Sequence, residues 1–124
     1  MTDEMSIRLQ LNVSNGEFVD SLAESFTADF PIIGKGGGIQ IIGTAEEAIS
    51  FGDILYEGWT LLKNLDDTNI IDYGPDSTGM VACLRLDPGE AAMFRLKPGV
   101  TIKAKARTAA CRLLVACFDT ATST

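Results

Sequence analysis

The chain has 124 residues, 46% of them hydrophobic, and a formal net charge of −7 at pH 7. This length favours one compact core, and the acidic excess argues against nucleic-acid binding, which needs clustered Lys and Arg. The N-terminal sequence lacks the basic and apolar regions of a signal peptide, and no apolar run approaches the roughly 20 residues that cross a bilayer. We therefore expect a protein made in the cytoplasm, with neither a nucleic acid nor a membrane as partner.

Charge is unevenly distributed along the chain. Residues 1–62 hold ten acidic residues against Arg8 and Lys35, whereas residues 63–124 hold seven acidic residues against eight basic ones. Two interpretations stay open. Either the two halves offset each other within one domain, or copies of the chain pair an acidic surface with a basic one. The second interpretation predicts self-association.

The N-terminal segment predicts a β-hairpin. In residues 6–13, SIRLQLNV, every second residue is apolar, which is the pattern of a half-buried strand. Asn15 and Gly16 then predict a tight turn, because both tolerate a positive φ. Residues 17–30 are expected to return as the partner strand, with Phe18 entering the core near its start.

A glycine-rich stretch follows, in which four of the five residues 34–38 are glycine. Their spacing fits no phosphate-binding motif, so we expect a flexible or tightly turning loop before a strand over residues 39–42. The sequence TAEE that starts at Thr44 has the form of a helix capping box and predicts at most one helical turn across 44–49. The apolar residues of this segment also continue a strand alternation.

Short apolar segments separated by turn residues make up the rest of the chain. The pattern Leu-charged-Pro-Gly occurs twice, as LDPG at 86–89 and as LKPG at 96–99. Proline presets φ and glycine supplies a positive φ, so each copy predicts a type II-like reversal, and together they predict a meander. The predicted strands cover residues 59–64, 69–73, 80–86, 91–96, 100–107 and 112–118.

These elements predict an all-β fold: an antiparallel β-sandwich or jelly-roll-like barrel of about eight short strands with little helix. The alternation does not distinguish a jelly roll from an immunoglobulin-like sandwich. We expect a single domain over residues 1–118 and a flexible polar tail over residues 119–124.

No arrangement of residues indicates catalysis or metal binding. The chain has no His, so the Ser-His-Asp and Cys-His arrangements are excluded within one chain. Acidic residues between Asp66 and Asp76 offer oxygen ligands, but not in the order of a calcium loop, and turn formation explains them equally well. Nothing places two carboxylates across a cleft as a glycosidase requires. We expect no catalytic residue, no cofactor and no metal.

The three cysteines, Cys83, Cys111 and Cys117, form an odd set without a CxxC pair. All three lie in apolar, strand-like segments. We therefore expect buried free thiols and no disulfide framework, which favours a cytoplasmic origin.

Four residues are candidates for a partner interface. Lys103, Lys105 and Arg107 alternate with apolar residues, which places three cations in a row on the outer face of one strand. They are either a solvated face that discourages edge pairing or a docking stripe for an acidic neighbour. Trp59, the only tryptophan, either packs in the core or anchors an interface.

The C-terminal half resembles a known class of proteins. The runs GWTLLKNLDDTNIIDYG and CLRLDPGEAAMFRLKPGVTIKAKARTAACRLLVACF, within residues 58–118, are similar to the small all-β virion proteins of tailed bacteriophages. In those proteins a segment G-x-x-x-x-x-N-L-D-x-T-N precedes a strand, L-x-P-G-E, a second strand, a strand rich in lysine and alanine, and a final apolar strand. The class includes capsid decoration or cement proteins, head–tail components and tail or fibre modules.

This resemblance implies a non-enzymatic structural component of a bacteriophage virion, made in the bacterial cytoplasm, and specifically a capsid decoration or cement protein that stabilises the head. It implies the major capsid protein or other virion proteins as partners, and self-association as a homo-oligomer such as a trimer. The alternative is a carbohydrate- or receptor-binding β-module of a tail or fibre. That module would need exposed aromatic residues, for which Trp59, Tyr56 and Tyr73 are the candidates.

Overall fold

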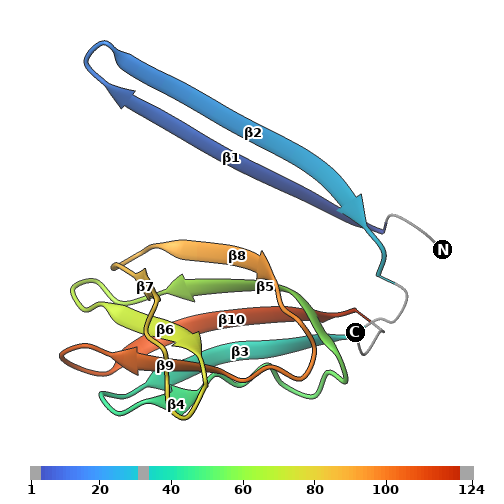
Figure 1. The fold of residues 1–124 in the computed structure, drawn as a ribbon, viewed down its shortest axis with the longest axis vertical. Coiled ribbons are helices and arrows are strands. Elements are labelled where there is room, and N and C mark those ends of the chain that lie inside the picture. Colours follow the sequence, from blue (N-terminus) through green and yellow to red (C-terminus); the bar gives the residue numbers. More distant parts are fainter. Residues whose placement is uncertain (1–3, 31–33, 121–124) are drawn as a thin grey trace. The chain divides into compact units, whose positions relative to one another are not determined.

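The computed structural model describes residues 4–30 and 34–120 and divides the chain into two compact units, Met1–Pro31 and Ile32–Thr124. The described residues form strands and no helix, which confirms the predicted all-β class. The first unit is a β-hairpin, and the second is a sandwich of two four-stranded sheets (Figure 1). The structure thus differs from the expected single domain over residues 1–118, because the hairpin forms a unit of its own.

The hairpin consists of β1 (Met5–Asn15) and β2 (Phe18–Ala28), paired along their whole length. Gly16 occupies the turn with a φ of 60°, as the Asn-Gly pair predicts. The predicted alternation is present, but residues 4–30 of the unit supply no second layer over the apolar face. Phe18 is 64% exposed, so its prediction as a core residue is wrong. Alternation determines which residues share a face and carries no information about what covers that face.

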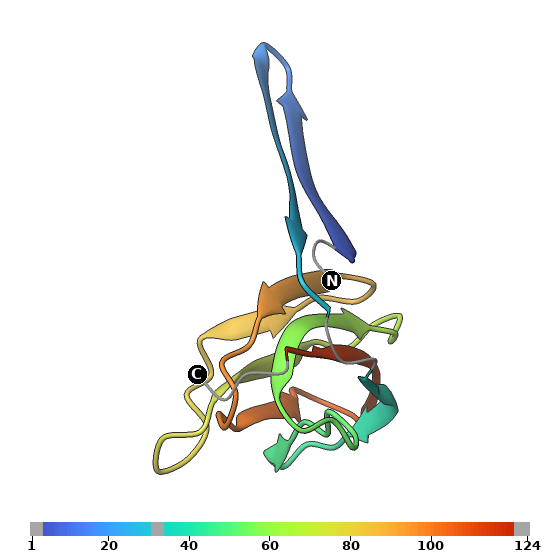
Figure 2. The ribbon, with the colours of Figure 1, turned by 90° about the vertical axis from the view of Figure 1, so that its right-hand side faces the viewer.

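The sandwich contains eight strands in two antiparallel sheets. The first sheet has the order β3-β10-β5-β8, and the second sheet has the order β4-β9-β6-β7. The strands are β3 (Lys35–Ile42), β4 (Glu47–Ala48), β5 (Glu57–Asn64), β6 (Ile71–Pro75), β7 (Leu84–Leu86), β8 (Ala91–Arg95), β9 (Ile102–Ala106) and β10 (Cys111–Asp119). Figure 2 shows the same strands from a second side, with β3 and β10 next to each other as their pairing requires.

The strand pairs are nested. β6 pairs with β7, β5 with β8, β4 with β9 and β3 with β10, so each outer pair encloses the inner ones in sequence. Two further pairings, β5 with β10 and β6 with β9, join the nested pairs into the two sheets.

The core lies between the two sheets and is built from the inward residues of both. Leu62 and Leu113 in the first sheet and Ile71 in the second are at most 1% exposed. Both sheets use small residues as well, such as Ala104 in β9, which lets the layers approach closely. The further members of this buried cluster are Ile42, Ile49, Phe51, Tyr73, Leu86, Leu96, Ala106, Cys111, Val115 and Cys117.

The glycine-rich stretch is part of β3 and not the expected loop. Residues 36–38 pair with β10 along its second half. A Cβ atom on Gly36 would lie 1.8 Å from the carbonyl oxygen of Phe51, and one on Gly37 would lie 2.3 Å from the carbonyl oxygen of Val115. Glycine is therefore required here by the close approach of neighbouring backbones, a long-range constraint that the local sequence does not reveal.

The two Pro-Gly turns connect different sheets. Asp87 and Glu90 close the first turn, with the amide of Glu90 donating to the carbonyl of Asp87 at 3.0 Å, and Gly89 has a φ of 79°. The reversals are thus type II-like, as predicted. However, β7 and β9 belong to the second sheet and β8 to the first, so the expected meander is wrong. The turns carry the chain between the layers.

The predicted helical turn across 44–49 is absent, and β4 occupies part of that segment. The side-chain amide of Gln40 holds the segment extended, since its oxygen accepts from the Ser50 amide at 2.8 Å and its nitrogen donates to the Ala48 carbonyl at 3.0 Å. The side chains of Ile49 and Phe51 are buried. Two buried apolar residues at strand spacing thus outweigh the capping pattern.

The predicted tail over residues 119–124 begins too early. Asp119 is the last residue of β10 and is 5% exposed. Its backbone amide donates to the carbonyl of Gly34 at 2.9 Å, and its carboxylate accepts from the amide of Leu55 at 3.3 Å. Residues 121–124 lie outside the described part of the chain.

Candidate partner interface

The cationic row Lys103, Lys105 and Arg107 lies on and just after β9, on the outer face of the second sheet. Ala104 and Ala106 between them are fully buried, so the alternation has the predicted direction. β9 lies between β4 and β6, which means that the row does not protect a free edge.

Acidic neighbours within the same chain neutralise much of this row. Lys103 Nζ lies 3.7 Å from Glu46 Oε1 and 3.6 Å from Asp76 Oδ1. Arg107 binds Asp72 through two contacts, Nη2 to Oδ1 at 2.7 Å and Nε to Oδ2 at 3.2 Å. These hydrogen bonds and the charge of Asp72 raise the pKa of Arg107 above its ordinary value. The row is thus part of a mixed-charge surface.

Trp59 lies on the opposite side of the sandwich, on the outer face of the first sheet. The buried residues of β5, Thr60, Leu62 and Asn64 among them, point into the sandwich, and Trp59 belongs to the alternate set. It is half-buried and is absent from the buried cluster of the core. The structure therefore does not bring Trp59 together with the cationic row.

The outer face of the first sheet is largely apolar. On β10 and β5, half-buried apolar side chains such as Leu114 and Leu61 point outward, and on β3 the side chains of Ile39 and Ile41 are 59% and 67% exposed. The strand register places these residues on one surface. The apolar residues of this face are Ile39, Ile41, Trp59, Leu61, Ala91, Met93, Leu114, Ala116 and Phe118.

Four cations border these apolar residues on the outer face of the first sheet: Lys35, Lys63, Arg95 and Arg112. All four are exposed, and within the described ranges none of them forms an ion pair. Glu57, at the start of β5, is the one acidic residue that the alternation places on this face. The two outer faces therefore differ: on the second sheet two of the three cations of the row are paired with acidic residues, whereas the first sheet is apolar with unneutralised positive charge.

The glycines of β3 create a shallow groove in this face. A cavity of about 520 Å³ is lined by Leu61, Leu114 and Ala116, the side chain of Lys35, and the glycine backbone over residues 36–38. The glycine backbone over residues 36–38 projects no side chains into this space, so it forms one wall of the groove. The groove has the volume and the largely apolar lining to receive a side chain of a partner.

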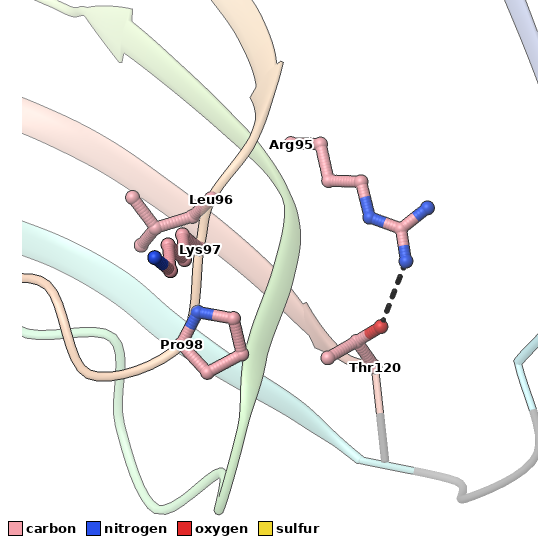
Figure 3. Close-up of a pocket in the computed structure, with 5 residues that line it drawn as sticks. All are labelled: Arg95, Leu96, Lys97, Pro98 and Thr120. Carbon is pink, nitrogen blue, oxygen red and sulfur yellow. Dashed lines mark hydrogen bonds between the residues drawn. The ribbon is translucent and has the colours of Figure 1, made fainter. Parts of the chain in front are cut away.

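A smaller cavity of about 250 Å³ lies at the end of β8 (Figure 3). Arg95 and Thr120 face each other across it, with Arg95 Nη2 donating to Thr120 Oγ1 at 3.2 Å. The remaining lining comes from the segment Leu96–Pro98 that starts the second Pro-Gly turn. The cavity therefore places the cations Arg95 and Lys97 together, between the end of β8 and the second Pro-Gly turn.

The sequence of β10 already indicated that the outer face of the first sheet is apolar, although the strand predictions did not use this pattern. β10 reads CRLLVACFD, an almost continuous apolar run in an antiparallel strand. Strands with one solvated face alternate, whereas a continuous run is typical of a strand covered on both faces. The outer face of the first sheet is therefore richer in apolar residues than a fully solvated strand face.

The cysteines separate into two environments. Cys111 and Cys117 are buried free thiols, as predicted, and burial raises the pKa of both. Cys83 is exposed, so its prediction as a buried thiol is wrong. It lies just before β7 and outside the alternation that buries Leu86.

The acidic segment 66–76 is organised by its own turns. The carboxylate of Asp66 accepts from the backbone amides of Thr68 and Asn69 at 3.0 and 2.6 Å, and these bonds lower the pKa of Asp66. Among residues 4–30 and 34–120, no three His, Cys, Asp or Glu side chains gather as a group that could hold a metal ion. The turn-forming interpretation thus accounts for Asp66.

Comparison with known proteins gives no match to a family model, to a curated protein or to a solved structure. In the described part of the chain there is no apolar helix of the length needed to span a membrane.

Proposed function

We propose that the chain is a non-enzymatic structural component of a tailed-bacteriophage virion, a capsid decoration protein that binds and stabilises the head. One observation carries the proposal: alongside the sandwich, the chain has a hairpin whose apolar side chains are largely uncovered. Leu11 and Leu22, opposite each other in the hairpin, are 57% and 59% exposed. Contiguous exposed apolar surface of this kind marks an interaction site, so the chain is suited to assembly.

The pairing of the sandwich strands supports the same role. We infer that the nested pairs and the strand orders β3-β10-β5-β8 and β4-β9-β6-β7 form a jelly roll, a double-sheet architecture found in viral capsid domains and in lectins. A fold does not by itself define a function. The resemblance of the turn pattern to that of virion proteins and the uncovered hairpin together favour the particle role.

The alternative, a carbohydrate- or receptor-binding module, loses one of its three candidate aromatic residues. Tyr73 is 4% exposed in the core, and burial raises its pKa. Tyr56 and Trp59 are half-buried and remain as candidates for stacking on a sugar. The proposed partners are accordingly the major capsid protein, other virion proteins and further copies of the chain.

The proposal is tested with a tailed phage whose genome encodes the chain. Heads prepared without the protein are mixed with purified chain, sedimented and examined by negative-stain microscopy. We expect the chain to co-sediment in a saturable, regular array and to raise the temperature at which the heads rupture. A chain that stays in the supernatant but binds a glycan array, and loses that binding in Tyr56→Ala or Trp59→Ala, would establish the alternative instead.

A further inference from the structure

We propose that the apolar face of the hairpin packs on the outer face of the first sheet of a second copy of this chain. The inference deepens the proposed assembly role by naming the occupant of the exposed hairpin. Its test uses the purified chain alone, so a negative result would leave the virion proposal standing.

The hairpin supplies one of the two surfaces. Directly opposed residues of an antiparallel pair lie on the same side, so the register places the apolar residues of β1 and β2 on one face. The opposite face is mostly polar, with Ser, Thr, Asn, Gln and Arg at most of its positions. The exposed members of the apolar face are Leu9, Leu11, Val13, Phe18, Leu22 and Phe26.

The outer face of the first sheet supplies the other surface. It presents exposed Ile39 and Ile41 beside the half-buried side chains of β10 and β5, and the groove above the β3 glycines interrupts it. Two sheets pack face to face at about 10 Å when the side chains of one fill spaces in the other. Large side chains of the hairpin, such as Phe18, match a groove lined by apolar side chains and glycine backbone.

The charges of the two surfaces are complementary. Asp20 and Glu24 lie on the apolar face of the hairpin, opposite Val13 and Leu9. The receiving face carries Lys63 and Arg112 near the ends of its two central strands, β5 and β10, and neither forms an ion pair among the described residues. The second sheet is the poorer receiver, because Lys103 and Arg107 on its outer face already have acidic partners. Such a contact would pair acidic residues of the N-terminal half of the sequence with basic residues of the C-terminal half.

The area favours an exchange between copies. Strands of 11 residues are about 36 Å long, and a two-stranded face is about 10 Å wide, so one docked hairpin buries roughly 700 Å² in total. This is below the approximately 1,000 Å² that a stable interface needs. When each copy both gives and receives a hairpin, the total reaches roughly 1,400 Å², which lies in the standard range. A reciprocal exchange of hairpins in a closed dimer, which places both docked hairpins in one interface, therefore follows.

The first experiment measures the oligomeric state of the full-length chain by sedimentation velocity up to about 100 µM, above the micromolar Kd of weak interfaces. We expect a closed oligomer for the wild type. Leu11→Gln with Leu22→Gln should raise its dissociation constant about a hundredfold or more, because two apolar side chains lose their cover. The matched control changes the opposed pair at the next position, Gln10→Ser with Ala23→Ser, on the other face, and should change little.

The second experiment identifies the receiving surface and the copy that provides it. In a Cys83→Ser background, chains carrying Leu22→Cys are mixed with chains carrying Ile39→Cys and treated with a short bismaleimide. We expect a linked dimer that forms only when both variants are present. A chain that carries both cysteines and links only within itself would show docking on its own sheet and overturn the proposal.

Two further outcomes bear on the proposal. Glu24→Arg and Arg112→Glu should each weaken the oligomer, and their combination should recover at least part of the loss, because the combination restores an opposite-charge pair. A wild type that stays monomeric throughout the concentration range would overturn the proposal, as would an oligomer that the Leu11 and Leu22 changes leave intact.

Discussion

The hairpin and the sandwich use the same period-two pattern with opposite results. In β10 the inward residues Leu113 and Val115 are 1% and 2% exposed, whereas in the hairpin Leu11 and Leu22 keep more than half of their surface in contact with solvent. The difference does not lie in the strands, because β1 and β2 are longer and more regularly paired than most strands of the sandwich. It lies in the presence of a second layer, which a two-stranded ribbon cannot provide for itself.

The comparison teaches where the stability of each unit resides. The sandwich gains its free energy of folding by burying both inner faces against each other. The hairpin is stabilised by its backbone hydrogen bonds and cross-strand contacts. Its apolar face is still exposed, so burying that face against a partner would be favourable. Folding stability and assembly energy are therefore located in different units of the same chain.

The largest expected effect comes from core substitutions, which test whether folding stability resides in the sandwich and not in the hairpin. Leu62→Ala removes a fully buried side chain between the sheets and should lower the free energy of unfolding by about 3–4 kcal/mol. Leu11→Ala, the same change in the hairpin, should alter it by less than about 0.5 kcal/mol. Urea titrations, run at concentrations that dissociate any oligomer, compare the two. Equal losses would mean that the hairpin is covered within the isolated chain, contrary to the comparison.

The second effect concerns polar residues in the two units. Asn64 is fully buried; its Nδ2 donates to the carbonyls of Asn69 and Leu86 at 2.9 and 3.0 Å, and its Oδ1 accepts from the Asp66 amide at 2.9 Å. Asn64→Ala leaves these backbone groups without a partner and should cost about 2–3 kcal/mol of unfolding free energy.

The control for Asn64 lies in the hairpin. Asn12 accepts a hydrogen bond from Ser21 Oγ at 2.6 Å, but both residues are exposed, so water replaces the partner in Asn12→Ala. We expect a change below about 0.5 kcal/mol. A loss comparable to that of Asn64→Ala would show that burial is not what distinguishes the two asparagines.

The all-β class, the hairpin turn at Asn15 and Gly16, and most strands of the sandwich were predictable from local patterns. The errors arose where distant backbones decide the structure. The glycines of β3 resemble a loop in sequence, and only the approach of Phe51 and Val115 explains why they form a strand. Likewise, a Pro-Gly turn fixes a reversal but not the sheet that receives the next strand.

The third expected effect concerns the turns of the two units, which are held by different interactions. The hairpin turn relies on the positive φ of Gly16, whereas the turn after β5 relies on the carboxylate of Asp66. Because its pKa is lowered in the folded chain, ionised Asp66 stabilises the fold above its unfolded pKa of about 3.9. This contribution is lost as the pH falls through the lower folded pKa.

Asp66→Asn should therefore lower the melting temperature at neutral pH, and its difference from the wild type should shrink as the pH falls below the unfolded pKa and through the lower folded pKa. Asp67→Asn, one residue away and exposed, is the control and should leave the melting curve unchanged at both pH values. A difference for Asp66→Asn that persists in acid would show that the carboxylate charge does not stabilise this turn.

The candidate interface was less predictable than the fold. Lys103, Lys105 and Arg107 stood out because like charges at strand spacing are visible in the sequence. Their acidic neighbours Asp72 and Asp76 come from other segments and become partners only through the pairing of β6 with β9 and the turn that follows β6. The outer face of the first sheet is spread over four strands, of which only Trp59 was singled out, because its surface depends on register.

The smallest expected effect is that of the cationic row. Replacing Lys103, Lys105 and Arg107 together by Gln should lower the melting temperature by less than Asn64→Ala does, because exposed ion pairs exchange their partners for water at little cost. High salt should reduce the difference further by screening these charges. Circular dichroism melts at low and high salt measure both effects.

The same triple variant separates the two outer faces as docking surfaces. If the row were the main contact with virion partners, the triple change should abolish binding to undecorated heads at low salt. We expect instead a smaller loss than that of Leu11→Gln with Leu22→Gln, since Lys103 and Arg107 are already held by acidic residues of their own chain. Their attraction for an acidic partner is reduced because these contacts neutralise part of their charge. Co-sedimentation of both variants with heads at two salt concentrations shows which variant loses more binding. A larger loss for the triple variant would place the principal interface on the second sheet.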